Sequence, residues 1–385
     1  MSEASGTEPN KASSTEPSNA ASKASGKAAK NKQKIVGLNV ARAFAIIGMI
    51  IVNFKIVIGS EGPGWLQAVA DVFSGKAAAT FVVLAGLGLS LMAKSAQGDP
   101  LKKRKVQWKV FKRALFLFVI GLSYYFIWPA DILHYYGLYM LLGLALLFRP
   151  PSYSFRIALV LIILFPILLF NFNYETGWNF ESLEYLDFWT VEGFFRNLFY
   201  NGFHPFIPWA AFLLIGIWLG HKDLYDETFI IALLQRGLAL FVTMQVLSPF
   251  AIKQAILVLG FSPESAEMVF GTASMPPNFM YMLNGIGIAF TVISLSILWA
   301  WRKKDSALIK ALDRTGRMAL TFYVLHVLVG MSIPSLISDI ALGEFSIYFT
   351  LPYALGFAIL CILLANWYLG KWKQGPLEWL LRKIA

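Results

Sequence analysis

The stretch TGRMALTFYVLHVLVG, residues 315–330, places a few polar side chains inside a long apolar run. Arg317 opens the run, and Tyr323 and His326 lie three residues apart within it. Polar side chains in a helix that otherwise suits lipid are costly and usually serve a function. The stretch therefore indicates a membrane-spanning helix with functional polar groups, and similar segments recur along the chain.

The composition places the whole chain among membrane proteins. Of its 385 residues, 57% are hydrophobic and only 14% are charged, and the mean hydropathy is +0.61. A soluble domain usually carries about 25% charged residues, and a bilayer core about 30 Å thick requires about 20 apolar residues per helix. We therefore predict an all-α fold, a polytopic helical protein of the cell membrane.

Residues 1–34 differ in composition from the rest of the chain. They are rich in Ser, Ala, Lys, Glu and Asn and contain no aromatic residue. Such a segment cannot bury enough apolar surface to offset the entropy of ordering it, and it lacks the apolar centre of a signal peptide. We predict a disordered cytoplasmic tail over residues 1–34 and a transmembrane helical domain over residues 35–385.

Hydropathy predicts about ten transmembrane helices. They are expected at residues 35–58, 72–93, 114–128, 132–147, 157–172, 205–220, 237–260, 279–301, 318–337 and 345–369. Most Lys and Arg residues fall at the two termini and in the connections 94–113, 149–156, 221–236 and 302–317, whereas the connection 173–203 is acidic. Because positively charged connections stay in the cytoplasm, both termini are predicted to be cytoplasmic.

The net charge of +11 follows from these membrane-flanking residues, so nucleic acid is not an expected partner. The alternative is that a strongly positive cytoplasmic mouth attracts an anionic, nucleotide-like ligand. Cys361 is the only cysteine, which excludes a disulfide framework, and no paired-histidine spacing suggests a metal site.

The first predicted helix has a polar face. Asn39, Arg42, Ile46, Met49 and Asn53 share one side at helical spacing. The face places a cation and a carboxamide within the predicted membrane interior, where they would line a functional cavity. The alternatives are that Arg42 reaches the headgroups and that Asn53 forms a hydrogen bond between helices.

Two pairs of ionisable residues fall near the predicted outer ends of helices. Asp71 and Lys76 lie at the start of a predicted helix rich in small residues, and they form either a packing pair or part of a substrate site. Asp131 and His134 are spaced i and i+3, so the carboxylate can orient the imidazole as a general base. The alternative for Asp131 is a helix N-cap.

The remaining histidines are ranked by position. His204 precedes a helix at its predicted outer end and is expected to face the same outer cavity as His134. His326 lies at mid-depth, where a hydrogen-bonded role in the bundle is the alternative to a functional one. His221 falls in a cytoplasmic connection and is expected to be a surface residue.

Several segments resemble the ordered motifs of a known family. They are LNVARAFAIIGMIIVNF (38–54), DVFSGKAAATFVVLAGLGLSL (71–91), DILHYYGLY (131–139), HPFIPWAAFLLIGIWLG (204–220), TGRMALTFYVLH (315–326) and GPLEWLLR (375–382). The chain resembles the YeiB-like bacterial membrane proteins, which are similar to the transmembrane acyltransferases typified by heparan-alpha-glucosaminide N-acetyltransferase. This resemblance also implies the bacterial inner membrane as the location.

The resemblance implies that cytoplasmic acyl-CoA donates its acyl group to a sugar on the far side. The catalytic His of those acyltransferases lies in the loop after the first helix, but the corresponding segment here, GSEGPGWLQAVA (59–70), contains no His. This chain also has Asn39 where the family favours Asp, and Ala43 where it favours Gly.

These observations lead to a hypothesis for the mechanism. Arg42 and Arg317 would hold the phosphates of acyl-CoA, which acts as a co-substrate rather than a permanently bound cofactor. His134, oriented by Asp131, would deprotonate the acceptor, and Asn53 would polarise the thioester carbonyl. His204 and Lys76 would contribute to substrate binding.

Two other functions stay open at this stage. The chain could be a transporter or flippase for a small anionic or lipid-linked solute, or a non-catalytic membrane partner. Membrane lipids and a small-molecule or glycan acceptor are the expected partners. The chain could also assemble as a homodimer.

Overall fold

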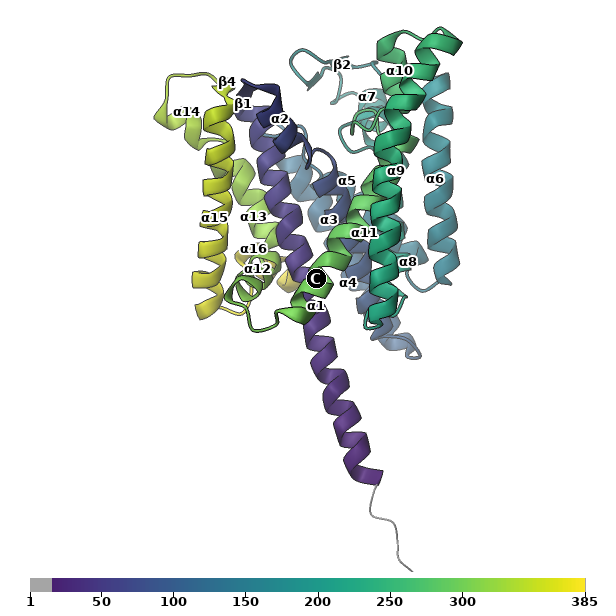
Figure 1. Cartoon of the computed structure of the whole chain (residues 1–385), viewed down its shortest axis with the longest axis vertical. Helices are drawn as coiled ribbons and strands as arrows, with labels where there is room; N and C mark the ends of the chain where they lie inside the picture. Colours follow the sequence, from purple (N-terminus) through teal and green to yellow (C-terminus); the bar gives the residue numbers. More distant parts are fainter. Residues whose placement is uncertain (1–15, 385) are drawn as a thin grey trace, which may run out of the picture.

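The structure, a computed structural model, describes the backbone of residues 16–384 and the side chains of residues 36–384. The described part is a helical bundle with a few very short strands (Figure 1). Its first half consists of α1 (Glu16–Ile58), β1 (Gly59–Glu61), α2 (Gly64–Asp71), α3 (Lys76–Lys94), α4 (Pro100–Ser123), α5 (Leu133–Leu146), α6 (Pro151–Asn171), β2 (Trp178–Asn179), β3 (Glu184–Tyr185), α7 (Val191–Arg196) and the π-helical turn η1 (Asn197–Asn201). Its second half consists of α8 (Phe206–Gly220), α9 (Glu227–Leu259), α10 (Pro263–Phe270), α11 (Phe279–Arg302), α12 (Ala307–Arg317), α13 (Ala319–Leu325), the π-helical turn η2 (His326–Gly330), α14 (Ile333–Ile337), β4 (Gly343–Ser346), α15 (Ile347–Lys371) and α16 (Pro376–Ile384).

The helices confirm the prediction of a multi-pass membrane protein. Within residues 16–384, seven helical segments are long and apolar enough to cross a membrane. An eighth span results if Val191–Asn201 and Phe206–Gly220, which meet at an angle of 46°, are counted as one broken helix. The other two of the ten predicted spans correspond to α4, whose first half is strongly basic, and α5, which has 14 residues. Neither passes as a span on length and composition.

The beginning of α4 differs from the prediction. Residues 102–113 were expected in a loop because of their many charges, yet the helix begins at Pro100. Asp99 is its N-cap and accepts hydrogen bonds from the backbone nitrogens of Leu101 and Lys102, at 3.0 and 3.1 Å. Pro at the first helical position suits such a start. The pair Asp99-Pro100 is a local signal for the start of a helix, but the many charges that follow it favoured the prediction of a loop.

The N-terminal tail stays a prediction. Residues 1–15 of the segment predicted as disordered lie outside the described residues, and α1 begins at Glu16.

The helix α1 occupies the centre of the bundle. It packs against α3 and α11 on one side and against α12, α13 and α15 on the other, as Figure 1 shows. The parallel pairing of β1 with β4 joins the end of α1 to the segment that precedes α15. Residues on opposite sides of α1 therefore face two separate sets of helices.

Glycine allows α3 and α8 to pack backbone against backbone. A side chain at Gly86 would overlap the carbonyl oxygen of Leu213, and one at Gly216 would overlap the carbonyl oxygen of Val83. Small residues at such crossings permit the close van der Waals contact that drives helix association in membranes. This crossing fixes the position of α8, which follows directly after His204.

Candidate functional site

Two separate polar cavities lie among the described residues of the bundle. The first, called here the basic cavity, has a volume of about 720 Å³ and lies where α12 and α16 meet α1, α3 and α4. Five cationic side chains line it: Arg42, Arg113, Arg317, Lys373 and Arg382. The helix α16, which contains most of the motif GPLEWLLR (375–382), supplies part of the wall through Glu378, Leu381 and Arg382.

The cations of the basic cavity lack carboxylate partners. None of the five takes part in the ion pairs found among the described residues. The Nε atom of Arg113 is buried and has no hydrogen-bond partner among the described residues. Gathered like charges repel one another and are costly to bury. The arrangement therefore favours an anionic ligand, and guanidinium groups suit phosphate oxygens in particular.

Arg42 is oriented by a short chain of hydrogen bonds. Its Nη1 donates to Asn39 Oδ1 at 2.6 Å, and Asn39 Nδ2 donates to Asp313 Oδ1 at 2.8 Å. Asn39, at a position where the related family favours Asp, thus links the guanidinium to a carboxylate of α12. Arg42 therefore lines an interior cavity, as the helical face predicted.

Glu378 is the one acidic residue on the wall of the basic cavity. Its carboxylate accepts hydrogen bonds from the backbone nitrogen of Thr321, at 3.0 Å, and from Thr321 Oγ1, at 2.6 Å. Burial raises the pKa of Glu378 above its ordinary value, although these two bonds act in the opposite direction. The contact attaches α16 to the beginning of α13.

The second cavity, called here the His204 cavity, has a volume of about 570 Å³. Its lining includes Asn53 from α1, His204 from the segment before α8, and Glu184 from β3. His204 is partly exposed, and its Nδ1 atom is buried without a hydrogen-bond partner among the described residues. The cavity therefore offers an imidazole and a carboxamide to a bound molecule.

Asn53 is held by His326. The Asn53 Nδ2 and His326 Nε2 atoms are 3.0 Å apart, and His326 Nδ1 lies 3.3 Å from the carbonyl oxygen of Phe322. A carbonyl oxygen only accepts, so Nδ1 carries the proton and Nε2 accepts from Asn53. The second N–H of the Asn53 amide is left for the cavity. His326 is thus a fully buried positioning group.

Asp131 and His134 form a buried network whose side chains line neither cavity. The two side chains are fully buried, and His134 Nδ1 lies 3.2 Å from Asp131 Oδ2. The carboxylate also accepts from the hydroxyl groups of Tyr124 and Tyr323 and from the backbone nitrogens of Leu133 and His134. The spacing predicted this pair correctly, and Asp131 also makes the backbone bonds of an N-cap.

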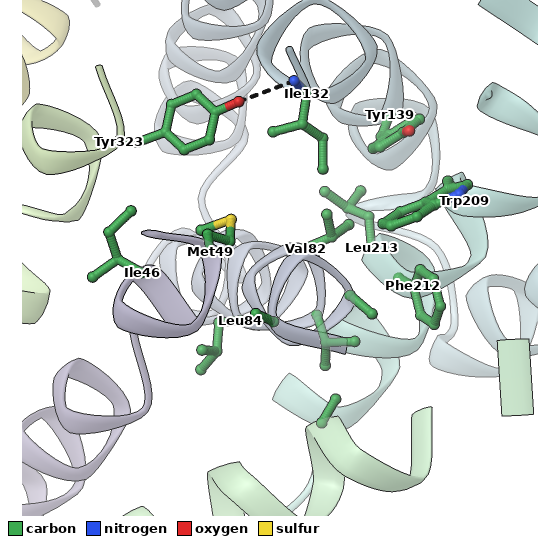
Figure 2. Close-up of a cluster of buried hydrophobic side chains, with 14 of the residues drawn as sticks. Ile46, Met49, Val82, Leu84, Ile132, Tyr139, Trp209, Phe212, Leu213 and Tyr323 are labelled. Carbon is green, nitrogen blue, oxygen red and sulfur yellow. Dashed lines mark hydrogen bonds between the residues drawn. The ribbon is translucent and has the colours of Figure 1, made fainter. Parts of the chain in front are cut away.

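Tyr323 connects this network to the neighbouring helix. Its hydroxyl donates to Asp131 Oδ1 at 3.0 Å and accepts from the backbone nitrogen of Ile132 at 3.1 Å, the bond drawn in Figure 2. The His134 Nε2 atom has no partner among the described residues. His134 therefore keeps one unused nitrogen, but its side chain does not reach the His204 cavity.

The remaining predicted residues lie in different places. Arg317 lines the basic cavity, and its Nη2 donates to the carbonyl oxygen of Lys373 at 2.9 Å. Lys76 lies on neither polar cavity but in a third hollow between α1, α3 and α11. Trp178 and Tyr185, in the connection 173–203, are buried in a cluster with Tyr125 and are therefore packing residues.

The two polar cavities approach each other along α1 and α3. Arg42 and Asn53 are 11 residues apart on α1, which corresponds to about 16 Å along the helix axis. On α3 the separation is smaller, because Ala78 lines the His204 cavity and Phe81, one turn later, lines the basic cavity. Ile46 and Met49 of α1 belong to a cluster of packed hydrophobic side chains (Figure 2), and Met49 also lines the His204 cavity.

Comparison with known families identifies the chain. The family model described as "Heparan-alpha-glucosaminide N-acetyltransferase, catalytic" matches residues 34–239, which is more than half of the 385 residues. The chain therefore belongs to this family. A second model, described as "Protein of unknown function (DUF418)", matches residues 222–385 and corresponds to the YeiB-like family that the motifs resemble. No curated protein matches the chain.

Proposed function

We propose that this protein transfers an acyl group from cytoplasmic acyl-CoA, across the membrane, to an acceptor bound in the His204 cavity. The observation that carries the proposal is the basic cavity, where five cations gather with no carboxylate partner among the described residues. The family match to an N-acetyltransferase catalytic domain supports an acetyl group as the one transferred.

The proposal includes an orientation in the membrane. The basic cavity lies at the end of the bundle with the Lys-rich and Arg-rich connections, which the positive-inside rule assigns to the cytoplasm. Both termini then lie in the cytoplasm. Ten spans result if α4 and α5 also cross the membrane, with the basic first half of α4 at the cytoplasmic surface and the short α5 enclosed by its neighbours.

On the donor side, the nucleotide phosphates of acyl-CoA would lie against Arg42 and Arg317. Arg113, Lys373 and Arg382 would complete the phosphate site. The pantetheine arm would run along α1 and α3 and would have to displace the packed side chains that separate the two cavities where their linings come closest. The thioester would then reach Asn53.

On the acceptor side, His204 is the better candidate for the general base than His134. His204 lines the cavity, whereas His134 is fully buried. The acceptor hydroxyl or amine would give its proton to His204 and attack the thioester carbonyl carbon, while the free N–H of Asn53 stabilises the developing oxyanion. The C–S bond then breaks, and the coenzyme A thiolate takes the proton from His204. Asp131 and His134 would act as positioning residues.

The test is acetyl-CoA binding and turnover by the full chain in detergent or vesicles. We expect saturable binding by calorimetry, about 10- to 100-fold weaker in Arg42→Gln and in Arg317→Gln because each loses a charge-assisted hydrogen bond. Arg236→Gln, which removes an exposed cation outside the cavity, is the charge-matched control. His204→Gln should retain binding and lose transfer.

The transporter or flippase hypothesis gives a different result in the same experiment. Cavities at opposite ends of the same two helices would also suit alternating access. Two results together would favour the transporter and refute the acyltransferase. The protein would move an anionic solute across the vesicle membrane, and the wild type would bind neither acetyl-CoA nor longer acyl-CoA species.

A further inference from the structure

We propose that the acceptor is a membrane lipid with an anionic phosphate, held in a lateral groove with its phosphate at Lys76. This inference rests on the proposed acyltransferase function and specifies its acceptor class. The lateral groove is the third hollow, with a volume of about 500 Å³, between α1, α3 and α11.

The walls of the lateral groove suit an acyl chain. They are formed mainly by apolar side chains, with Thr80 and Ser296 as the uncharged polar exceptions. Thr80 uses its hydroxyl within the helix, where it donates to the carbonyl oxygen of Lys76 at 2.8 Å. The rim is open to the surroundings of the bundle, since Val72 and Leu295 are 58% and 50% exposed. These helices are candidate membrane spans, so the surroundings are lipid.

Lys76 supplies the charge complementarity. It is the only charged side chain among the residues that line the groove. Its Nζ donates to the backbone carbonyl of Asp71 at 3.3 Å, whereas the Asp71 carboxylate is paired with Lys55 at 2.7 Å. Among the described residues, the Lys76 ammonium thus has no carboxylate partner. An ammonium beside apolar walls is costly, and a lipid phosphate would offset that cost.

The groove shares a wall with the His204 cavity. Phe73 and Ala77 line both hollows. The helix α1 approaches this wall closely at Gly48, where an added Cβ would lie 2.9 Å from Ala77 Cβ and 3.0 Å from Phe73 Cδ1. Only one layer of side chains therefore separates the two. A lipid whose tail lies in the groove can extend its head group past Phe73 towards His204.

This placement explains how an acceptor arrives at a site within a membrane. A water-soluble acceptor needs only the His204 cavity and leaves the groove and Lys76 without a role. A lipid needs the groove, Lys76 and the His204 cavity. Its tail requires apolar walls, its phosphate requires a cation, and its reactive hydroxyl or amine requires a base. The groove, Lys76 and His204 supply these in that order.

The experiment uses photoactivatable phosphatidylglycerol, which carries both a phosphate and head-group hydroxyls, and photoactivatable diacylglycerol, which lacks the phosphate. The full chain is placed in phosphatidylcholine vesicles, and the labelled residues are mapped by mass spectrometry. We expect phosphatidylglycerol to label Val292 and Leu295 about fivefold more than diacylglycerol does, and Lys76→Gln to remove this preference. Leu295→Trp should block labelling by both lipids. Leu363→Trp, an exposed position of α15 outside the groove, is the control.

Three results would overturn the inference: equal labelling by the two lipids, unchanged preference in Lys76→Gln, or cross-linking of the groove to a second copy of the chain. Measuring acetyl-CoA binding by the same variants distinguishes failure of the lipid-acceptor inference from failure of the proposed acyltransferase function. Retained binding without groove labelling refutes only the lipid acceptor, whereas labelling without acetyl-CoA binding supports the lipid site and refutes the acyltransferase. With radioactive acetyl-CoA, label in the lipid fraction that is lost in Lys76→Gln supports both.

Discussion

Replacement of Asp131 by alanine should destabilise the protein severely, whatever the acceptor is. The carboxylate is fully buried and receives four donors besides the His134 ring: the hydroxyl groups of Tyr124 and Tyr323 and the backbone nitrogens of Leu133 and His134. An orphaned buried donor costs about 1–3 kcal/mol, but such losses within one network are not additive. We therefore expect a total loss of about 3–5 kcal/mol, the range found when one partner of a buried charge pair is removed.

The assay is the fraction of monodisperse protein that remains in mild detergent after heating. The expected apparent midpoint for Asp131→Ala lies about 6 °C or more below that of the wild type. Asp305→Ala, at an exposed position, should stay within about 0.5 kcal/mol. An Asp131→Ala protein as stable as the wild type that had merely lost activity would refute the reasoning. It would mean that Asp131 serves the chemistry directly and that the network does not position the surrounding helices.

Three further predictions concern binding and packing. Asn39→Ala should weaken acetyl-CoA binding about fivefold in calorimetry, because Arg42 loses the acceptor that orients it; unchanged affinity would contradict this role. Because burial raises its folded-state pKa above the ordinary value, Glu378 ionises within the cavity only at a higher pH than an exposed glutamate does. Acetyl-CoA binding and the stability of the folded state should therefore both fall as the pH rises through that raised pKa, and Glu378→Gln should remove the dependence; the same pH profile in the variant would exclude Glu378. Gly86→Ala should lower the apparent melting midpoint by about 3 °C or more, because the new Cβ meets a backbone carbonyl. The control Gly356→Ala, with open space around the new Cβ, should be neutral or slightly stabilising. Equal midpoints for the two variants would refute the close packing of α3 and α8.

The sequence by itself determined the class of the protein and several parts of the site. Hydropathy and charge placement depend only on local composition, so they established a multi-pass helical protein and most of its spans. Helical spacing placed Arg42 and Asn53 on one face, and the structure finds both on cavity walls. The i, i+3 spacing likewise predicted the contact between Asp131 and His134.

Only the tertiary structure decided which polar groups meet. The links from Asn39 to Asp313 and from Asn53 to His326 join residues more than 270 positions apart, and no local pattern encodes such distances. The charged segment before residue 113 is helical because Asp99 caps it, which overrides the expectation of a loop. Lys76 is only five residues from Asp71 in sequence, yet the Asp71 carboxylate forms its ion pair with Lys55 of α1.

The division has a physical reason. Burial in lipid and helix periodicity are properties of neighbouring residues, so they can be read along the chain. A cavity is the space that packed helices leave empty, and its lining depends on crossings such as those at Gly86 and Gly216. The sequence therefore identified the polar residues worth considering, whereas the crossings determined that His204 lines a cavity and that His134 does not.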